Sequence, residues 1–89
     1  MLKKNVVIIN KLGLHARAAA RFVETAAAYE SDIRVKIGDK TVNGKSIMGL
    51  MMLAAAKGAN VELVVHGRDE ERAIMALVRL IKNRFEEEI

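Results

Sequence analysis

The sequence predicts an α+β domain in which three helices cover one face of a four-stranded, mostly antiparallel sheet. Segments with alternating apolar and polar residues are interleaved with segments whose apolar residues recur every three or four positions, in the order βαββαβα. The chain contains no proline, and glycine marks most of the breaks between segments. Its 89 residues suit one small domain, which we expect to span residues 1–89.

The first strand is predicted at Leu2–Asn10, where β-branched residues are common. The run is too short before Gly13 for a stable helix, and we expect the strand to be largely buried. A helix is predicted at Ala16–Tyr29, because its apolar residues fall at positions i, i+3, i+4 and i+7. These residues are Ala19, Phe22, Val23 and Ala26.

Two short antiparallel strands are predicted at Ile33–Ile37 and Lys40–Asn43. Apolar and charged residues alternate strictly in the first run, and only Gly38 and Asp39 separate it from the second. A two-residue connection that contains glycine is typical of a β-hairpin.

A short helix is predicted at Ile47–Leu53, with Ser46 in position to cap its free amides. A strand follows at Val61–His66, because apolar residues occupy every second position up to Gly67. The last helix begins after Asp69, which we expect to cap it. Its apolar stripe consists of Ile74, Leu77, Val78, Ile81 and Phe85. The run Glu86–Glu88 is interpreted as a solvated tail that frays the helix end, since acids there oppose the helix dipole.

The composition excludes several classes of site. Without cysteine the chain has no disulfide bond, thiol nucleophile or thiolate zinc site, and no other residues have metal-site spacing. We therefore expect no metal and no cofactor. The apolar run Val6–Ile9 is far shorter than a signal-peptide core or a membrane span, so we expect neither export nor membrane insertion. These features predict a cytoplasmic protein.

The charge of the chain is unevenly distributed. The net charge is +4, with residues 1–57 at +6 and residues 58–89 at −2. A basic half indicates an anionic partner, which could be nucleic acid, an acidic protein face or a phosphorylated group. Only three aromatic residues occur, and none lies on a predicted strand, which disfavours a base-stacking surface. A small basic nucleic-acid-binding module is therefore the alternative hypothesis, and we expect no nucleic-acid partner.

The segment Gly13–Arg17 places a histidine between a strand end and the start of a helix. The first amides of a helix have no internal acceptor, and the helix dipole favours an anion there. A neutral imidazole is a good nucleophile, so His15 could accept a phosphoryl group while Arg17 supplies a fixed positive charge. The plainer alternative is that His15 only caps the helix and Arg17 is a solvated charge. The other histidine, His66, has no ligand-type residues around it and is interpreted as structural.

A second polar segment precedes the short helix. Ser46 presents a hydroxyl next to Lys45, and a phosphate added there would meet positive charge and free amides. The alternative is an ordinary serine cap. The helix that follows is too short to bury all of its large apolar residues, and methionine adapts to several partners. We therefore expect Ile47, Met48 and Met51 to form an exposed docking surface.

Taken together, three motifs resemble the HPr family, the histidine-containing phosphocarrier proteins of the bacterial phosphotransferase system. They are Gly13–Arg17 followed by Ala19 and Ala20, Gly44–Gly49, and Ala54–Gly58. The motifs lie in register over the whole chain. The resemblance implies an open-faced β-sandwich with strand order 1-4-2-3.

The resemblance also implies roles for individual residues. His15 would be phosphorylated on Nδ1 by Enzyme I, which takes the phosphoryl group from phosphoenolpyruvate, and would pass it to an Enzyme IIA. Arg17 would neutralise the phosphoryl oxygens, and Ser46 would match the serine that an ATP-dependent kinase modifies in some bacteria. Such a carrier is a protein substrate without its own turnover, and we expect a monomer. The expected partner-binding residues are Ala16, Ala20, Lys45, Ile47, Met48 and Met51.

A third hypothesis is a regulatory relative that acts through phosphorylated Ser46 and a transcriptional regulator, with a serine kinase/phosphorylase as a further partner. His15 favours a retained carrier role. Sugar uptake and nitrogen or carbon regulation use similar carriers, so the sequence leaves the branch open. One position departs from the family pattern, because Ala18 stands where most members have proline. Alanine keeps an amide that proline lacks and restrains the loop less, which puts partner preference in doubt.

Overall fold

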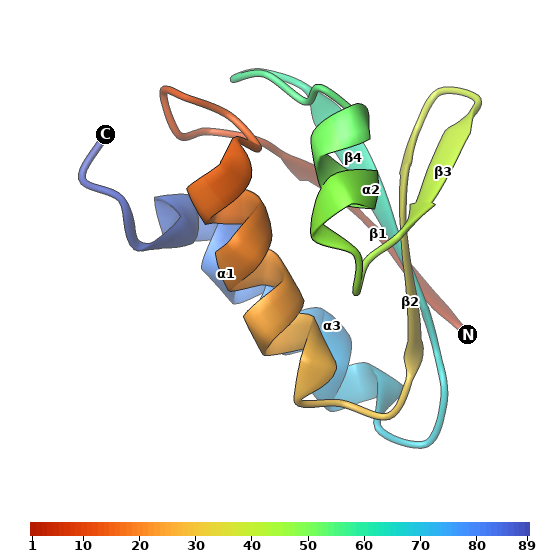
Figure 1. The fold of residues 1–89 in the computed structure, drawn as a ribbon. Helices are drawn as coiled ribbons and strands as arrows, with labels where there is room; N and C mark the ends of the chain where they lie inside the picture. The colour runs from red at the N-terminus through yellow and green to blue at the C-terminus, as the bar shows by residue number, and fades with distance from the viewer.

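The computed structural model describes residues 1–89. Along the chain the elements are β1 (Leu2–Val7), α1 (Ala16–Ala27), β2 (Asp32–Ile37), β3 (Lys40–Asn43), α2 (Ile47–Met52), β4 (Asn60–His66), α3 (Glu70–Lys82) and a short turn, η1 (Arg84–Glu86). Figure 1 shows α1 and α3 side by side, with the C-terminal end of the chain close to the start of α1.

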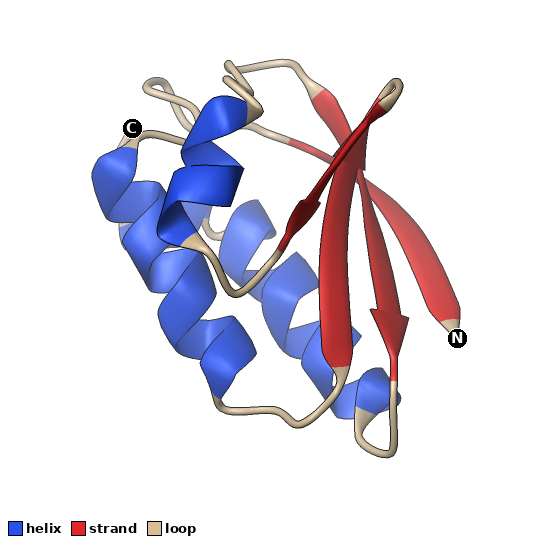
Figure 2. Cartoon of the chain, turned by 45° about the vertical axis from the view of Figure 1, so that its right-hand side comes forward, coloured by secondary structure: helices blue, strands red, loops and turns tan.

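The four strands form one sheet in the order β1-β4-β2-β3, and every neighbouring pair is antiparallel. Figure 2 shows the three helices on one side of this sheet, while its other face is uncovered. The predicted α+β class, the element order and the open-faced sandwich with strand order 1-4-2-3 are confirmed.

The hydrophobic core lies between the sheet and the helices. β4 sits in the middle of the sheet, and its inward residues Val61, Leu63 and Val65 are at most 1% exposed. Phe22 of α1 and Leu77 of α3 pack in the same core. Burying one such side chain contributes about 1.5–3 kcal/mol to folding, so this layer accounts for most of the stabilisation.

The predicted hairpin with a two-residue connection is confirmed. β2 and β3 pair from Arg34 with Asn43 to Ile37 with Lys40, which leaves Gly38 and Asp39 as the two-residue connection. Gly38 has φ +55°, a left-handed conformation that glycine adopts without steric cost.

The prediction of a long, largely buried first strand is wrong. β1 ends at Val7, and only Val6 among its residues is buried. The reason is its place in the sheet: β1 is an edge strand, and one face of the sheet is open. Burial on a single face leaves alternate residues exposed.

The ends of α1 and α2 differ from the predictions by one or two residues, and α3 ends at Lys82, before Phe85, which we expected on its apolar stripe. α1 ends at Ala27 rather than Tyr29, because the amides of Ala28 and Tyr29 donate to carbonyls three residues earlier and tighten the last turn. α2 ends at Met52 rather than Leu53.

Asp69 lies at the start of α3 but does not cap it, so that prediction is also wrong. The Asp69 carboxylate instead accepts hydrogen bonds from the amides of Glu30 (2.9 Å) and Ser31 (3.0 Å) and from Ser31 Oγ (2.5 Å). Because these three donors occupy the carboxylate, it does not cap the helix. The hydrogen bond from the Ser31 hydroxyl, with those from the two amides, lowers the pKa of Asp69 to about 2. Asp69 thus ties α3 to the segment between α1 and β2.

We expect Asp69→Asn to lower the midpoint of thermal unfolding by several degrees at neutral pH and by much less in acid. An aspartate in an unfolded chain has a pKa of ~3.9, above its value in the folded protein, so folding favours the ionised form. This contribution is complete above about pH 5 and is lost as pH falls through about 2. Thermal unfolding of both proteins across this range measures it, with Asp39→Asn in the hairpin turn as the control. A difference that stays constant with pH would contradict the prediction.

The C-terminal residues are not simply a solvated tail, contrary to the prediction for Glu86–Glu88. After α3, Arg84, Phe85 and Glu86 adopt φ values of 55°, 53° and 66°, so the chain makes a left-handed turn there. Phe85 is fully buried, and the amide of Lys11 donates to the carbonyl of Ile89 at 2.7 Å. Burial of one aromatic ring and this hydrogen bond hold the segment against the rest of the fold.

Candidate functional site

The loop between β1 and α1 is held in a fixed shape by residues 55–56. Gly13 has φ +67°, and a Cβ there would collide with the carbonyl oxygen of Ala55. The amide of Leu14 donates to the same oxygen at 2.8 Å. Glycine at position 13 therefore permits a close approach that sets the direction in which the chain enters α1.

His15 occupies the N-cap position of α1. Its backbone is extended, with φ −79° and ψ −179°, and its Nδ1 accepts a hydrogen bond from the amide of Arg17 at 3.3 Å. The side chain is 28% exposed. An imidazole nitrogen thus lies among the first amides of a helix, where the helix dipole places positive potential.

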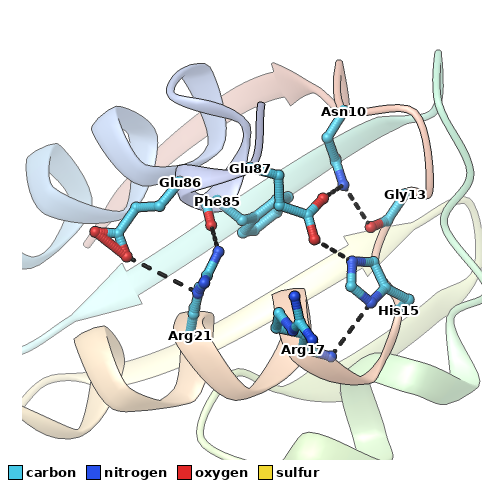
Figure 3. A network of polar contacts seen from close by, with 8 residues as sticks. All are labelled: Asn10, Gly13, His15, Arg17, Arg21, Phe85, Glu86 and Glu87. Carbon is cyan, nitrogen blue, oxygen red and sulfur yellow. Dashed lines mark hydrogen bonds and ion pairs between the residues drawn. The ribbon is translucent and has the colours of Figure 1, made fainter. Parts of the chain in front are cut away.

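The other ring nitrogen of His15 contacts the C-terminal segment. Figure 3 shows Nε2 facing a carboxylate oxygen of Glu87, whose other oxygen accepts from Asn10 Nδ2 at 2.8 Å. Because a carboxylate only accepts and the Arg17 amide only donates, these partners assign the proton to Nε2 and a lone pair to Nδ1. The surroundings select the tautomer whose Nδ1 is free to act as a nucleophile.

Asn10, which lies in the loop between β1 and α1, fixes the position of Glu87. It is fully buried, and its Nδ2 donates both to Glu87 and to the carbonyl of Gly13, at 2.8 Å each. Both partners are acceptors, so the amide group must face them, and Asn10 Oδ1 has no hydrogen-bond partner. Although partial burial raises the pKa of Glu87, hydrogen bonds from Asn10 and His15 outweigh it and hold the pKa below its usual range.

The two arginines of α1 near the site have different surroundings. Arg21 donates through Nη1 to the carbonyl of Phe85 and lies 3.9 Å from Glu86. The guanidinium of Arg17 is exposed and has no ion-pair or hydrogen-bond partner, so it is available to an incoming anion. Ala18 is fully buried in the first turn and packs in the core.

Ser46 is the N-cap of α2, as the sequence predicts. Its Oγ accepts from the amide of Gly49 at 3.0 Å, and the residue is half-buried. Lys45 Nζ donates to the carbonyl of Tyr29 at 2.7 Å. The Gly49 amide thus already faces the atom that a phosphate would modify, whereas Lys45 would have to leave the Tyr29 carbonyl to reach that phosphate.

An exposed apolar surface lies on α2. The exposed fractions are 41% for Ile47, 75% for Met48 and 45% for Met51, as expected for a docking surface, and Met52 reaches 71%. α2 packs against α1, on which Ala16 is exposed and Ala20 is half-buried.

Sequence reasoning missed Asn10 and Glu87. They are 77 residues apart, and neither belongs to a motif. The one available signal was Phe85, an aromatic residue at the end of the α3 stripe, because a buried ring there requires the following chain to fold back.

The remaining candidates form no second centre. His66 is exposed, with Nδ1 3.8 Å from Glu70. No group of three or more His, Asp or Glu side chains is arranged to hold a metal ion. None of the helices combines the length and the apolar character needed to span a bilayer.

Comparisons with known proteins agree with the geometry. Residues 2–83 match the family model PTS-HPr, described as the PTS HPr component phosphorylation site. The chain is 56% identical to the phosphocarrier protein HPr of Neisseria meningitidis serogroup B over 87 residues, 98% of each chain.

Solved structures of HPr proteins have the same fold as this chain. The crystal structure of HPr-C-His from Thermoanaerobacter tengcongensis is 50% identical to this chain and superposes on it with a TM-score of 0.96. The alignment covers 100% of each chain. Crh of Bacillus subtilis, 40% identical with a TM-score of 0.76 over 94% of this chain and 97% of its own, is described as a domain-swapped dimer. Our expectation of a monomer stays a prediction. Family match, identity and fold together show that this chain belongs to the HPr family of phosphocarrier proteins of the phosphotransferase system.

Proposed function

We propose that the chain, acting as one domain over residues 1–89, accepts a phosphoryl group from phosphorylated Enzyme I on His15 Nδ1 and passes it to an Enzyme IIA. One observation carries this proposal. His15 is a partly exposed N-cap residue whose Nδ1 lone pair faces the first amides of α1, with its proton held on Nε2 by Glu87.

The proposed transfer uses only groups of the two proteins and the phosphoryl group itself. The Nδ1 lone pair attacks phosphorus, the bond between phosphorus and the donor atom of Enzyme I breaks, and its electron pair stays with the donor. The Arg17 amide donates to Nδ1 across a long 3.3 Å hydrogen bond, and after transfer it donates to a phosphoryl oxygen instead. Transfer to an Enzyme IIA reverses these events, so the chain is a carrier without its own turnover.

Arg17 is the side chain that neutralises the transferred group. Arg17 follows His15 by two residues, and its guanidinium is exposed and has no ion-pair partner. Exposed amides and one mobile cation hold a phosphoryl group loosely enough for it to leave again. Arg21, in contrast, is engaged with the C-terminal segment and contributes to the shape of the site.

The test is a two-step transfer assay. The chain is incubated with labelled phosphoenolpyruvate and Enzyme I, and an Enzyme IIA is added afterwards. We expect one acid-labile phosphate per chain, which disappears from the chain as it appears on the Enzyme IIA. Labelling without Enzyme I, or label that never leaves, would contradict the carrier function.

We propose that Ser46 regulates this transfer and that a serine kinase/phosphorylase adds and removes a phosphate there. The chain phosphorylated on Ser46 would also contact a transcriptional regulator. Ser46 borders the apolar residues Ile47, Met48 and Met51 of α2. We propose that these residues, with Ala16, Ala20 and Lys45, contact Enzyme I. A negative charge at their edge would oppose an acidic partner face.

Ser46→Asp is expected to weaken binding to Enzyme I by up to about fivefold, most strongly at low salt, because an exposed charge interaction amounts to about 0.2–1 kcal/mol. The thermal midpoint should change little, since aspartate is also a good N-cap residue. Titration calorimetry at two salt concentrations measures the effect. Ser46→Asn is the matched control, because it caps equally well without charge. Equal affinity for Ser46→Asp and Ser46→Asn would contradict a regulatory charge.

A further inference from the structure

We propose that the groove between β1 and α3 binds an extended acidic segment of another protein, which adds to the sheet as a strand at the free edge of β1. The groove has a volume of about 750 Å³ and is lined by α3, by the residue that follows it and by one residue of β1. It shares no residue with the His15 loop or with the apolar surface on α2. A partner bound there would therefore not use the residues proposed for phosphoryl transfer.

The lining of the groove is positively charged. It contains the cations Lys4, Arg79 and Lys82 and no acidic side chain. None of the three cations forms an ion pair. Arg79 and Lys82 also suit the last turn of a helix, whose free carbonyls favour positive charge, but Lys4 belongs to a strand. Three unpaired cations from two elements around one groove indicate an anionic ligand.

Lys4 stands at a position of β1 where the fold favours an apolar residue. In the register with β4 it lies opposite Leu63, which is fully buried. Lys4 is therefore on the face of the sheet that the helices cover, as is the buried Val6 two residues later. Such an inward lysine on an edge strand opposes pairing with a second copy of that strand, because like charges would meet. An acidic strand, in contrast, is attracted to it.

The edge strand β1 offers an unused row of backbone hydrogen-bonding groups. β1 is the first strand in the order β1-β4-β2-β3 and has only β4 as a neighbour (Figure 2). Just after β1, the amide and the carbonyl of Ile8 bond to the segment that precedes β4. Backbone groups alternate in direction along a strand, so those of Lys3, Asn5 and Val7 point out from the free edge. An extended chain can pair with them, as in other complexes formed by strand addition.

The groove also offers apolar contacts to an added strand. Met75 is 61% exposed, and Val78, about one turn further along α3, is half-buried. Every second side chain of a strand paired with β1 would point toward the helix layer, and thus toward these two residues and the three cations. The fitting segment therefore carries acidic and apolar side chains in turn at every second position.

The test uses a synthetic peptide of about nine residues, a length typical of a strand. Every second residue is glutamate or valine in turn, the others are threonine, and both ends are blocked. The peptide is titrated into the ¹⁵N-labelled chain, and the amide signals are followed. We expect saturable shifts in β1 and in residues 74–83, none in α2, and a dissociation constant of about 0.1–1 mM that rises with salt.

Two modified peptides test strand pairing on the wild-type chain. One is methylated on all threonine nitrogens and the other on all glutamate and valine nitrogens. Only one of these two sets can face β1 in a paired strand, because backbone groups alternate in direction. We expect one modified peptide to bind at least about tenfold more weakly and the other to bind within about twofold of the original.

Charge-reversal variants test the lining of the groove. Lys4→Glu and Arg79→Glu should each weaken binding of the peptide about fivefold. Lys40→Glu is the matched control, because Lys40 is an exposed lysine on β3, the strand at the opposite edge of the sheet. It changes the net charge by the same amount and should bind the peptide like the wild type.

An equal loss of affinity in Lys40→Glu would overturn the inference, since it would indicate a general attraction between opposite charges. Equal effects of the two methylated peptides would also overturn it, as would the absence of shifts in β1 and α3 at about 1 mM peptide. The same holds if these signals respond only to the concentration of the chain itself, or only to vesicles of anionic phospholipid. Thermal unfolding shows whether each variant is folded, and the methylated peptides keep the test valid if a variant is unstable.

Discussion

Replacing His15 with alanine is expected to abolish phosphoenolpyruvate-dependent labelling completely. Nδ1 of His15 is the only imidazole nitrogen that lies at the N-terminus of an α-helix, next to the unpaired guanidinium of Arg17. Removing the side chain removes the atom that we propose accepts the phosphoryl group, and the neighbouring amides and Arg17 cannot substitute for it. Labelling with phosphoenolpyruvate and Enzyme I, followed by gel separation in alkaline conditions, measures the loss.

The fold of the His15→Ala variant should persist, because the side chain is 28% exposed and contributes a cap rather than core packing. Loss of an N-cap side chain costs about 0.5–2 kcal/mol. His66→Ala is the matched control, since it removes the other histidine, which lies exposed at the end of β4. Labelling of the His15 variant at the level of the His66 variant would contradict the assignment.

The second large effect is expected for Phe85→Ala, which should lower the free energy of unfolding by about 3–5 kcal/mol. The ring of Phe85 is fully buried although the residue lies beyond α3. A domain of this size has a total stability of about 4–13 kcal/mol, so the loss is a large fraction of the whole. Denaturant unfolding monitored by circular dichroism measures it.

The same variant should weaken the contact between Glu87 and His15, because Phe85 anchors the segment that carries Glu87. Phe85→Leu fills much of the same space and is expected to lose clearly less stability. A loss below about 1 kcal/mol for Phe85→Ala would mean that the C-terminal segment is frayed, and the described turn would be wrong.

Elements whose cause is local were predictable from the sequence. The hairpin at Gly38 and Asp39 follows from glycine in a two-residue connection, and Ser46 caps α2 because a serine hydroxyl satisfies a free amide three residues on. Asp69 shows the limit of such reasoning. Its position before a helix predicts a cap, but the donors it prefers belong to residues 30 and 31, which only the tertiary fold brings near.

The candidate site divides in the same way. His15 and Arg17 share a helix start, so the motif itself predicts their proximity. Glu87 lies 72 residues away and reaches His15 through a turn of three left-handed residues, none of which is glycine. Since such a turn is unfavourable locally, no local pattern predicts it. It persists because Phe85 is buried, which is a property of the assembled core.

The most direct test of the account is the identity of the phosphorylated atom in the wild-type chain. Protein labelled with ¹⁵N in its histidine rings is phosphorylated by Enzyme I and phosphoenolpyruvate, and long-range ¹H–¹⁵N spectra are recorded together with ³¹P spectra. The account predicts phosphorus bonded to Nδ1 of His15, with the proton retained on Nε2 facing Glu87. Phosphorus on Nε2 of His15, on His66 or on any other side chain would contradict it.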